Sequence, residues 1–153
     1  MKMSISAALH APDAKEAPYP VWTIDGVPLD EWLEKSLGCN LIKGLVPAYA
    51  WLIDDDDLAL ARKRLKPHAQ DCSTIVPLLI CSDDLDFRCT CVVVEQVTSG
   101  SQVTWRRFGF DCTDGSDHVG SSVMWVETGG VITFEASQLK AAIAEFERLT
   151  VAI

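Results

Sequence analysis

The stretch that most constrains the fold runs from Ile75 to Asp111, where an apolar segment, an acidic loop and a hairpin pattern follow one another. The apolar part, residues 73–81, predicts a central strand, in which Pro77 implies either a free N–H side or a kink. Two runs of β-favouring residues then flank a turn at residues 98–101 and predict a hairpin over residues 89–110. We therefore expect a central sheet with carboxylates clustered at one end.

Patterns on either side of this stretch predict the remaining elements. Helical spacing and capping residues predict helices over residues 31–37, 58–67 and 137–150, and β-favouring residues predict strands over residues 19–24, 123–127 and 131–135. The last two strands are expected to form a second hairpin around residues 128–130, and residues 41–53 a bent loop or broken strand. The predicted fold class is α+β: a single antiparallel sheet of about five strands, with the C-terminal helix packed on one face and short N-terminal helices at its edge.

The helix ends carry recognisable capping signals. Asp30 is a good N-cap for the first helix, and Gly38 is the usual residue just after a helix C-terminus. Four consecutive aspartates, residues 54–57, precede the second helix, where carboxylates cap free N–H groups and favour the helix dipole. This charge order therefore has a structural explanation of its own.

The N-terminal residues 1–18 read as a flexible arm rich in Ala, Pro and charge, followed by a single domain over residues 19–153. Their only apolar patch, residues 5–9, is interrupted by His10 too early for a secretory signal. No stretch reaches the roughly 18–20 apolar residues of a membrane span. We expect a cytoplasmic protein.

The charge balance narrows the classes of partner. The 153 residues include 13 basic and 22 acidic side chains, for a net charge of −9. Such a surface repels nucleic acid and anionic membranes, and it attracts basic partners over about 8–10 Å. We therefore expect no nucleic-acid or membrane binding. The oligomeric state is left open.

Six cysteines raise the question of disulfides or metal. Without an export signal the thiols are expected to stay reduced. Cys89 and Cys91 are two apart in a predicted strand, so both side chains would share a face and offer two thiolates. No second close pair or nearby histidine completes a tetrahedral site, so we interpret them as small buried hydrophobic residues and predict neither metal nor cofactor. His10, His68 and His118 are expected on the surface or in loops.

Motifs for catalysis are absent from the sequence. It contains no phosphate-binding glycine loop, nucleophile elbow, zinc-protease motif or EF-hand. The loop of residues 111–117 places carboxylates three apart around a glycine, but it lacks the alternating oxygens and closing Glu of a calcium loop, which favours a solvated turn. We predict no catalytic residues.

Two acidic clusters remain as candidate binding surfaces, because each lies beside aromatic or apolar residues. Aromatic anchors with charged surroundings are a typical hot-spot composition, and carboxylates steer basic partners. The alternative is that the aromatic residues are core and the aspartates are caps or solubilising charge. The predicted partner-binding residues are Asp54, Asp55, Asp56, Asp57, Asp83, Asp84, Asp86, Trp51 and Phe87.

The block from the apolar strand through the acidic turn to the hairpin resembles small bacterial immunity-type proteins of polymorphic or contact-dependent toxin systems. The hairpin ends in a W-x-R-x-G pattern, here from Trp105 to Gly109. The resemblance covers about a quarter of the chain. It implies tight, non-catalytic inhibition of a cognate toxin domain, often a basic nuclease. The aspartates would then face the toxin's cationic groove, while Trp105 and Arg107 maintain the sheet.

Three function classes stay open at this point. The favoured hypothesis is an interaction protein that neutralises a basic partner, in particular a bacterial toxin. A structural or regulatory subunit would show a large exposed apolar patch or a stable homo-oligomer. A small enzyme or ligand-binding domain would show a deep pocket lined by Cys, His or Asp with shifted pKa values.

Overall fold

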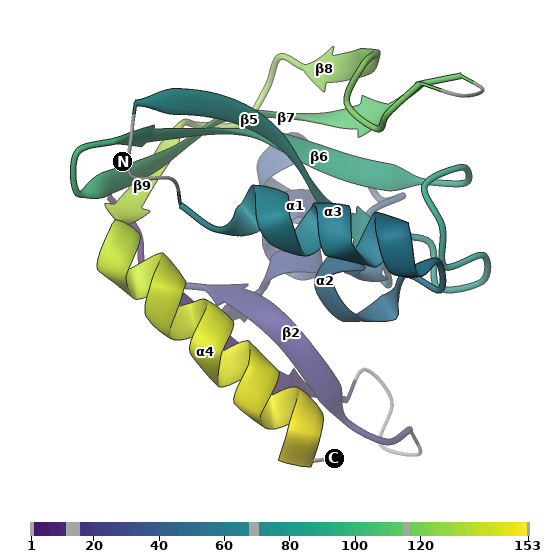
Figure 1. The fold of residues 1–153 in the computed structure, drawn as a ribbon, viewed down its shortest axis with the longest axis horizontal. Coiled ribbons are helices and arrows are strands. Elements are labelled where there is room, and N and C mark those ends of the chain that lie inside the picture. Colours follow the sequence, from purple (N-terminus) through teal and green to yellow (C-terminus); the bar gives the residue numbers. More distant parts are fainter. Residues whose placement is uncertain (1, 12–15, 68–70, 115–116, 153) are drawn as a thin grey trace.

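The computed structural model describes residues 2–11, 16–67, 71–114 and 117–152, which form an α+β fold with two sheets (Figure 1). The elements, in chain order, are β1 (Ile5–His10), β2 (Tyr19–Ile24), β3 (Val27–Pro28), α1 (Leu29–Leu37), β4 (Val46–Pro47), α2 (Ala48–Trp51), α3 (Asp55–Leu65), β5 (Cys72–Ile80), β6 (Cys91–Ser99), β7 (Gln102–Asp111), β8 (Val123–Val126), β9 (Ile132–Glu135) and α4 (Ala136–Ala152). No helix in the described ranges is both long enough and apolar enough to cross a bilayer.

The fold class is α+β as predicted, but the prediction of a single sheet of about five strands is wrong, because the structure has two sheets. A three-stranded sheet has the order β1-β2-β3, and a six-stranded sheet has the order β4-β5-β6-β7-β8, with β9 also on β7. The predicted arm, residues 1–18, must be corrected too, because Ile5–His10 form β1 and pair antiparallel with β2. Residues 12–15 of that arm lie outside the described residues.

Burial against distant parts of the chain explains why the first strand forms. Its Ala- and Ser-rich sequence has little strand preference of its own. Ile5 is nevertheless 4% exposed in the main core, and the hydroxyls of Ser6 and Thr23 are 2.6 Å apart across the β1–β2 pair. The segment is extended because β2 and α4 cover it, as the lower half of Figure 1 shows.

The central hairpins agree with the prediction. β5 pairs antiparallel with β6, and β6 pairs antiparallel with β7 around the turn between Ser99 and Gln102. Of the two alternatives predicted for Pro77, the register shift between Pro77 and Leu79 fits the kink. Alternate β6 side chains enter different cores: Val92 and Val94 face the main cluster, and Val93 faces a second one. Both faces of this sheet are therefore covered.

The predicted second hairpin is wrong. β8 and β9 do not pair with each other but lie one after the other along β7, β8 against residues 108–111 and β9 against residues 102–105. β7 is long enough to take both strands on one edge. Close approach of β8 requires Gly109, since a Cβ there would stand 2.6 Å from Val123 Cγ1 and 2.8 Å from the Met124 carbonyl oxygen.

The helix ends agree with the prediction in part. Gly38 ends α1 in the left-handed conformation as expected (φ +66°), but Pro28 stands at its N-cap. Asp30 lies instead in the first turn, and its carboxylate accepts a hydrogen bond from the Gly44 N–H at 2.9 Å. The segment predicted as a bent loop or broken strand, residues 41–53, contains the short elements β4 and α2.

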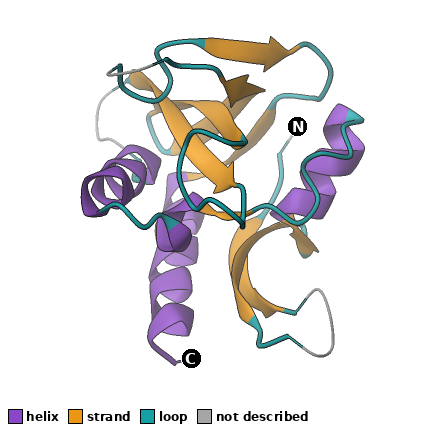
Figure 2. Cartoon of the chain, turned by 90° about the vertical axis from the view of Figure 1, so that its right-hand side faces the viewer, coloured by secondary structure: helices purple, strands orange, loops and turns teal. Residues whose placement is uncertain are grey.

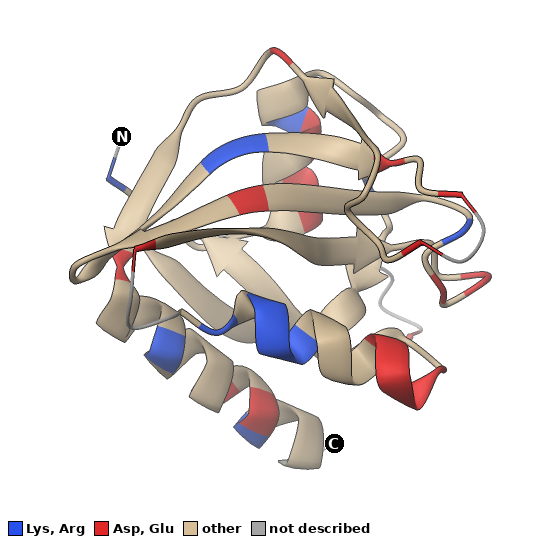
Figure 3. Cartoon of the chain, turned by 45° about the horizontal axis from the view of Figure 1, so that its top comes forward, with Lys and Arg blue, Asp and Glu red and all other residues tan. Residues whose placement is uncertain are grey.

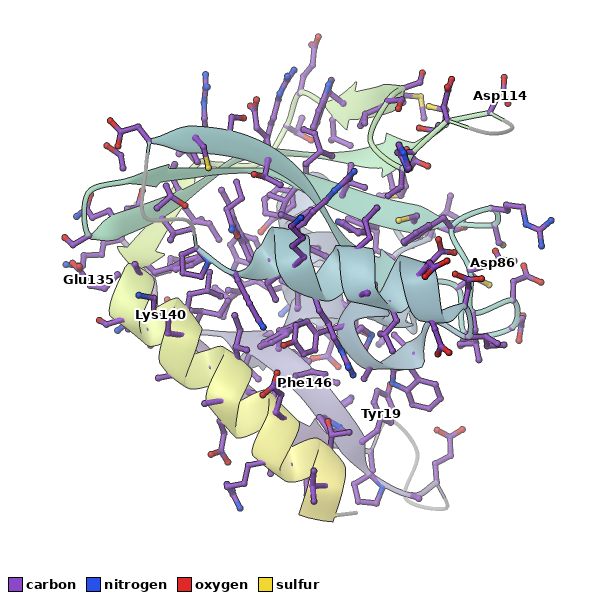
Figure 4. The ribbon with its side chains drawn as sticks, viewed as in Figure 1. Tyr19, Asp86, Asp114, Glu135, Lys140 and Phe146 are labelled. Atoms are coloured by element: carbon purple, nitrogen blue, oxygen red, sulfur yellow. The ribbon has the colours of Figure 1, made fainter. Side chains whose placement is uncertain are left out.

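An aromatic core joins α4 to the smaller sheet. The predicted inward face of α4 is buried, and Phe146 stacks on Trp22 with ring centroids 4.3 Å apart. Tyr49 meets both rings edge-on and donates its hydroxyl to Glu147 at 2.6 Å. Figure 4 labels Phe146 on the side of α4 that faces this core. α4 thus packs on the three-stranded sheet.

A buried polar pair links the larger sheet to α3. Gln96 is 1% exposed, and its Oε1 accepts a hydrogen bond from Trp105 Nε1–H at 2.9 Å. Its Nε2 donates to the carbonyl oxygen of Leu65, at the end of α3, also at 2.9 Å. Each of these buried groups has a partner, as polar groups in a core require.

Candidate functional site

The site is an acidic cleft of about 440 Å³ where three segments meet. These are the first turns of α3, the β5–β6 loop and the β7–β8 loop (Figure 3). Figure 2 looks onto this end of the molecule, where loops lie in front of the strands. The polar lining is Asp54, Asp57, Asp86, Arg88, Asp111, Thr113, Asp117 and His118, and the apolar lining is Leu60, Phe87 and Val119.

The apolar floor of the cleft is the outer surface of the second core cluster. Val119 is buried in that cluster, and Leu60 and Phe87 pack against it while remaining partly accessible. The floor therefore belongs to the packed interior and holds the loops in place. It also offers an apolar surface to whatever enters the cleft.

Asp54 has a structural task in addition to its place in the lining. It is the N-cap of α3, and its Oδ1 accepts a hydrogen bond from the Asp57 N–H at 2.9 Å. Asp55, Asp56 and Asp57 form the first helical turn, where free N–H groups and the helix dipole favour negative charge. The predicted capping role of this cluster is confirmed for Asp54.

The carboxylate of Asp57 lies close to other negative charges in the cleft. Partial burial raises its pKa above the ordinary range, and the nearby charges of Asp54, Asp56 and Asp86 raise the pKa further. Among the described residues no donor is hydrogen-bonded to this carboxylate. Its ionised form is therefore disfavoured here, and an incoming cation would relieve the repulsion.

Asp86 is, in contrast, held by its own loop. Its Oδ1 accepts from the Arg88 N–H at 2.9 Å, and its Oδ2 lies 3.1 Å from Arg88 Nη2. These bonds lower the pKa of Asp86. Leu85, with φ +54°, provides the left-handed turn that brings Asp86 back toward the chain. Arg88 itself is 91% exposed, so it neutralises the cleft only at the rim.

The third wall is the β7–β8 loop, which is fastened to α3. Asp111 Oδ1 accepts hydrogen bonds from Thr113 Oγ1 at 2.7 Å and from the Gly120 N–H at 2.9 Å. Arg64 of α3 donates to the Val119 carbonyl oxygen at 2.7 Å. Asp111 therefore supports the loop, whereas no donor among the described residues is hydrogen-bonded to the Asp117 carboxylate.

The structure brings together some of the predicted site residues and separates others. Four of the predicted residues line the cleft: Asp54, Asp57, Asp86 and Phe87. The two acidic clusters meet there, because the negative charge of Asp86 contributes to the raised pKa of Asp57. The remaining predicted residues are not part of its lining: Asp55, Asp56, Asp83, Asp84 and Trp51. The first four are exposed, and Trp51 packs edge-on against Tyr19 with ring centroids 5.5 Å apart.

Sequence reasoning missed the contribution of the β7–β8 loop. The sequence places Asp111, Asp114 and Asp117 three residues apart, a pattern that by itself predicts only a solvated turn. Asp111 and Asp117 in fact line the cleft together with His118, which lies in a loop as predicted. His68 lies outside the described residues. Only the fold shows that this loop faces the two acidic clusters.

The arrangement places carboxylates around an apolar floor, and those of Asp57 and Asp117 accept no hydrogen bond from the described residues. This combination suits a cation on an apolar stem, such as a Lys or Arg side chain, because the stem would cover Phe87 and Leu60 while the charged head would meet Asp57 and Asp117. Comparison of the chain with family models, with curated proteins and with solved structures finds no match. The site must therefore be interpreted from its own chemistry.

Proposed function

We propose that this protein is a non-catalytic binding protein whose acidic cleft captures and neutralises a basic protein partner. The observation that carries the proposal is Asp57, a partly buried carboxylate with a raised pKa, surrounded by like charge. When no partner is bound, the ionised Asp57 carboxylate destabilises the folded protein. A cationic side chain from a partner would remove this destabilisation. The net charge of −9 adds long-range attraction for the same class of partner.

The partner that we propose is a basic toxin domain of a bacterial polymorphic or contact-dependent system. The immunity-protein resemblance supports this choice, as does the match between an acidic inhibitor and a cationic nuclease groove. The cleft would receive one or two Lys or Arg side chains from that groove. The exposed aspartates outside the lining, such as Asp55 and Asp83, would then act as the charged rim that steers association.

A small cationic ligand is the second candidate, favoured by the size of the cleft. A volume of about 440 Å³ lies within the usual range for small-molecule sites, and two lining carboxylates have shifted pKa values, that of Asp57 raised and that of Asp86 lowered. The lining is rich in carboxylates, whereas small-molecule sites are mostly apolar with few polar groups. A charged partner side chain therefore fits the lining better than a drug-like ligand.

The test compares two variants that remove the same charge. The double variant Asp57→Asn/Asp117→Asn acts inside the cleft, and Asp55→Asn/Asp56→Asn acts on the exposed side of the same helix end. The gene neighbourhood is first searched for a basic toxin domain, and each variant is titrated calorimetrically with the domain found there. We expect the cleft variant to lose about 2 kcal/mol of binding free energy, roughly 30-fold in Kd, and the matched variant much less.

Equal losses for the two variants would show that net charge acts without the cleft, and absence of binding by the unaltered protein would contradict the proposal. Spermidine serves as the probe for the second candidate. Saturable spermidine binding that only the cleft variant abolishes, without binding of the toxin domain, would favour the small-ligand function.

A further inference from the structure

A second cluster of reactive side chains lies at the base of the β5–β6 loop. Cys81 directly follows β5, Cys89 comes shortly before β6, and Asp84 lies between them in the loop. The two sulfur atoms and a carboxylate oxygen all lie within 4.8 Å of one another. None of the three residues lines the acidic cleft. Figure 4 labels Asp86, which marks this loop at one end of the molecule.

Main-chain bonds hold the loop in the shape that brings these groups together. The Cys81 N–H donates to the Thr90 carbonyl oxygen at 3.0 Å and closes the base of the loop. The Leu85 N–H donates to the Cys81 carbonyl oxygen at 3.1 Å, so the chain folds back with Asp84 near both cysteines. The Leu85 carbonyl oxygen accepts from the Ile53 N–H at 3.2 Å, which fixes the loop to the segment before α3.

The ligand set has the chemistry of a zinc site. Tetrahedral Zn²⁺ takes thiolate sulfur at about 2.3 Å and carboxylate oxygen at about 2.0–2.2 Å, which places neighbouring ligand atoms about 3.5–3.8 Å apart. The three ligand atoms already lie within 4.8 Å of one another, so they need to approach by only about 1 Å to bind one ion. Cys81 is half-buried, whereas Asp84 and Cys89 are exposed, so rotation of the last two side chains provides this movement. Two thiolates favour zinc over magnesium or calcium.

This pairing differs from the one suggested by the sequence. Cys89 and Cys91 were expected on one strand face, but β6 begins only at Cys91, which is 1% exposed in the second core cluster. The prediction that Cys91 is a small buried hydrophobic residue is thus confirmed, whereas Cys89 is exposed. The thiol partner of Cys89 is Cys81, eight positions earlier and across the loop.

We propose that Cys81, Asp84 and Cys89 bind one Zn²⁺ ion, with the fourth coordination position open to water or to a ligand from a partner protein. The ion would close the loop in which Asp86, Phe87 and Arg88, between the ligands Asp84 and Cys89, line the acidic cleft. This proposal does not depend on the proposed function, because its ligands and the cleft carboxylates are different residues.

The test is a metal titration of the full chain kept reduced with a phosphine. Cobalt(II) chloride should give one bound ion per chain, with a thiolate-to-cobalt charge-transfer band and the visible bands of a tetrahedral ion, and zinc chloride should displace it. We expect Cys89→Ser and Cys81→Ser each to weaken zinc binding about 100-fold or more. Asp84→Asn should weaken it less, because an amide oxygen is a poorer ligand.

Two matched controls separate the site from general effects. Cys112→Ser removes another exposed thiol, and Asp83→Asn removes the adjacent exposed carboxylate. Both should bind zinc like the unaltered chain, as should the cleft variant Asp57→Asn/Asp117→Asn. Cobalt spectra without a charge-transfer band, or zinc affinity unchanged in Cys89→Ser, would overturn the proposal. Loss of both thiols to a Cys81–Cys89 disulfide, with no metal bound by the reduced chain, would overturn it as well.

Discussion

Two polar regions of this molecule are built on opposite principles. In the core, Gln96 joins the Trp105 indole N–H to the Leu65 carbonyl oxygen, and each of these groups has a partner. In the cleft, carboxylates from α3 and two loops gather around Asp57, whose pKa is raised by burial and by its neighbours. The first arrangement stabilises the native state, whereas the second costs stability at the place where we propose that a cation binds.

The largest effect is expected where the paired region is broken. Gln96→Leu removes both hydrogen bonds and leaves a buried N–H and a buried carbonyl oxygen without partners, so the free energy of unfolding should fall by about 3 kcal/mol. Urea unfolding followed by tryptophan fluorescence measures this loss. Ser73→Ala, which removes an exposed side-chain hydrogen bond to Glu95, is the control and should cost less than about 0.5 kcal/mol. Equal losses of stability in Gln96→Leu and Ser73→Ala would show that the buried hydrogen bonds contribute no more than the exposed one.

Asp54 belongs to both regions, since it caps α3 and also lines the cleft. Asp54→Ala should lower the free energy of unfolding by about 1 kcal/mol, because the Asp57 N–H loses its acceptor. Asp54→Asn keeps the cap and removes only the charge, so it should retain stability and still weaken partner binding. Chemical denaturation and calorimetric titration together separate the two roles. A loss of stability in Asp54→Asn equal to that in Asp54→Ala would contradict the capping assignment.

The smallest effect, and one of opposite sign, is expected at Asp57. Its raised pKa means that the folded protein holds a proton that the unfolded chain has already released, so its stability contribution falls as pH rises through that window and stays lower above it. Asp57→Asn should therefore raise the free energy of unfolding at neutral pH by no more than about 0.5 kcal/mol, since the group is partly in water.

The pH profile of that variant tests the sign. The gain should be constant above the folded pKa of Asp57 and should disappear as pH falls below the ordinary aspartate range, where both states of the unaltered protein are protonated. Thermal unfolding from acidic to neutral pH measures it. A variant less stable than the unaltered protein at neutral pH would show that Asp57 supports the fold, and the contrast between the two regions would fail.

Local patterns were sufficient to predict the elements that bury their own faces. The 3.6-residue spacing of Leu139, Ile143 and Phe146 predicted α4, and the two β-favouring runs that flank the turn at residues 98–101 predicted the central hairpin. β1 could not be predicted in this way, because its Ala-rich sequence is extended only through contact with β2 and α4. The pairing of both β8 and β9 with one edge of β7 could not be predicted either, because it depends on the assembled sheet.

The candidate site was predictable only in outline for the same reason. Acidic clusters with apolar neighbours marked two of its walls, and the predicted residues Asp86 and Phe87 line the cleft. The third wall depends on Arg64 and Gly120, whose contacts seat the β7–β8 loop against α3. No local signal shows which aspartates face one another across a cleft, since that depends on the loop contacts.

The place of β1 has a consequence for how the chain is made. Its covering helix is α4, and Lys2 pairs with Glu135, 133 residues further along. A ribosome adding about 5–20 residues per second leaves the first strand uncovered for several seconds before α4 emerges. α4 can cover the smaller sheet only after synthesis has passed residue 136, so a nascent chain cut short before that residue would lack the helix that packs on β1 and β2.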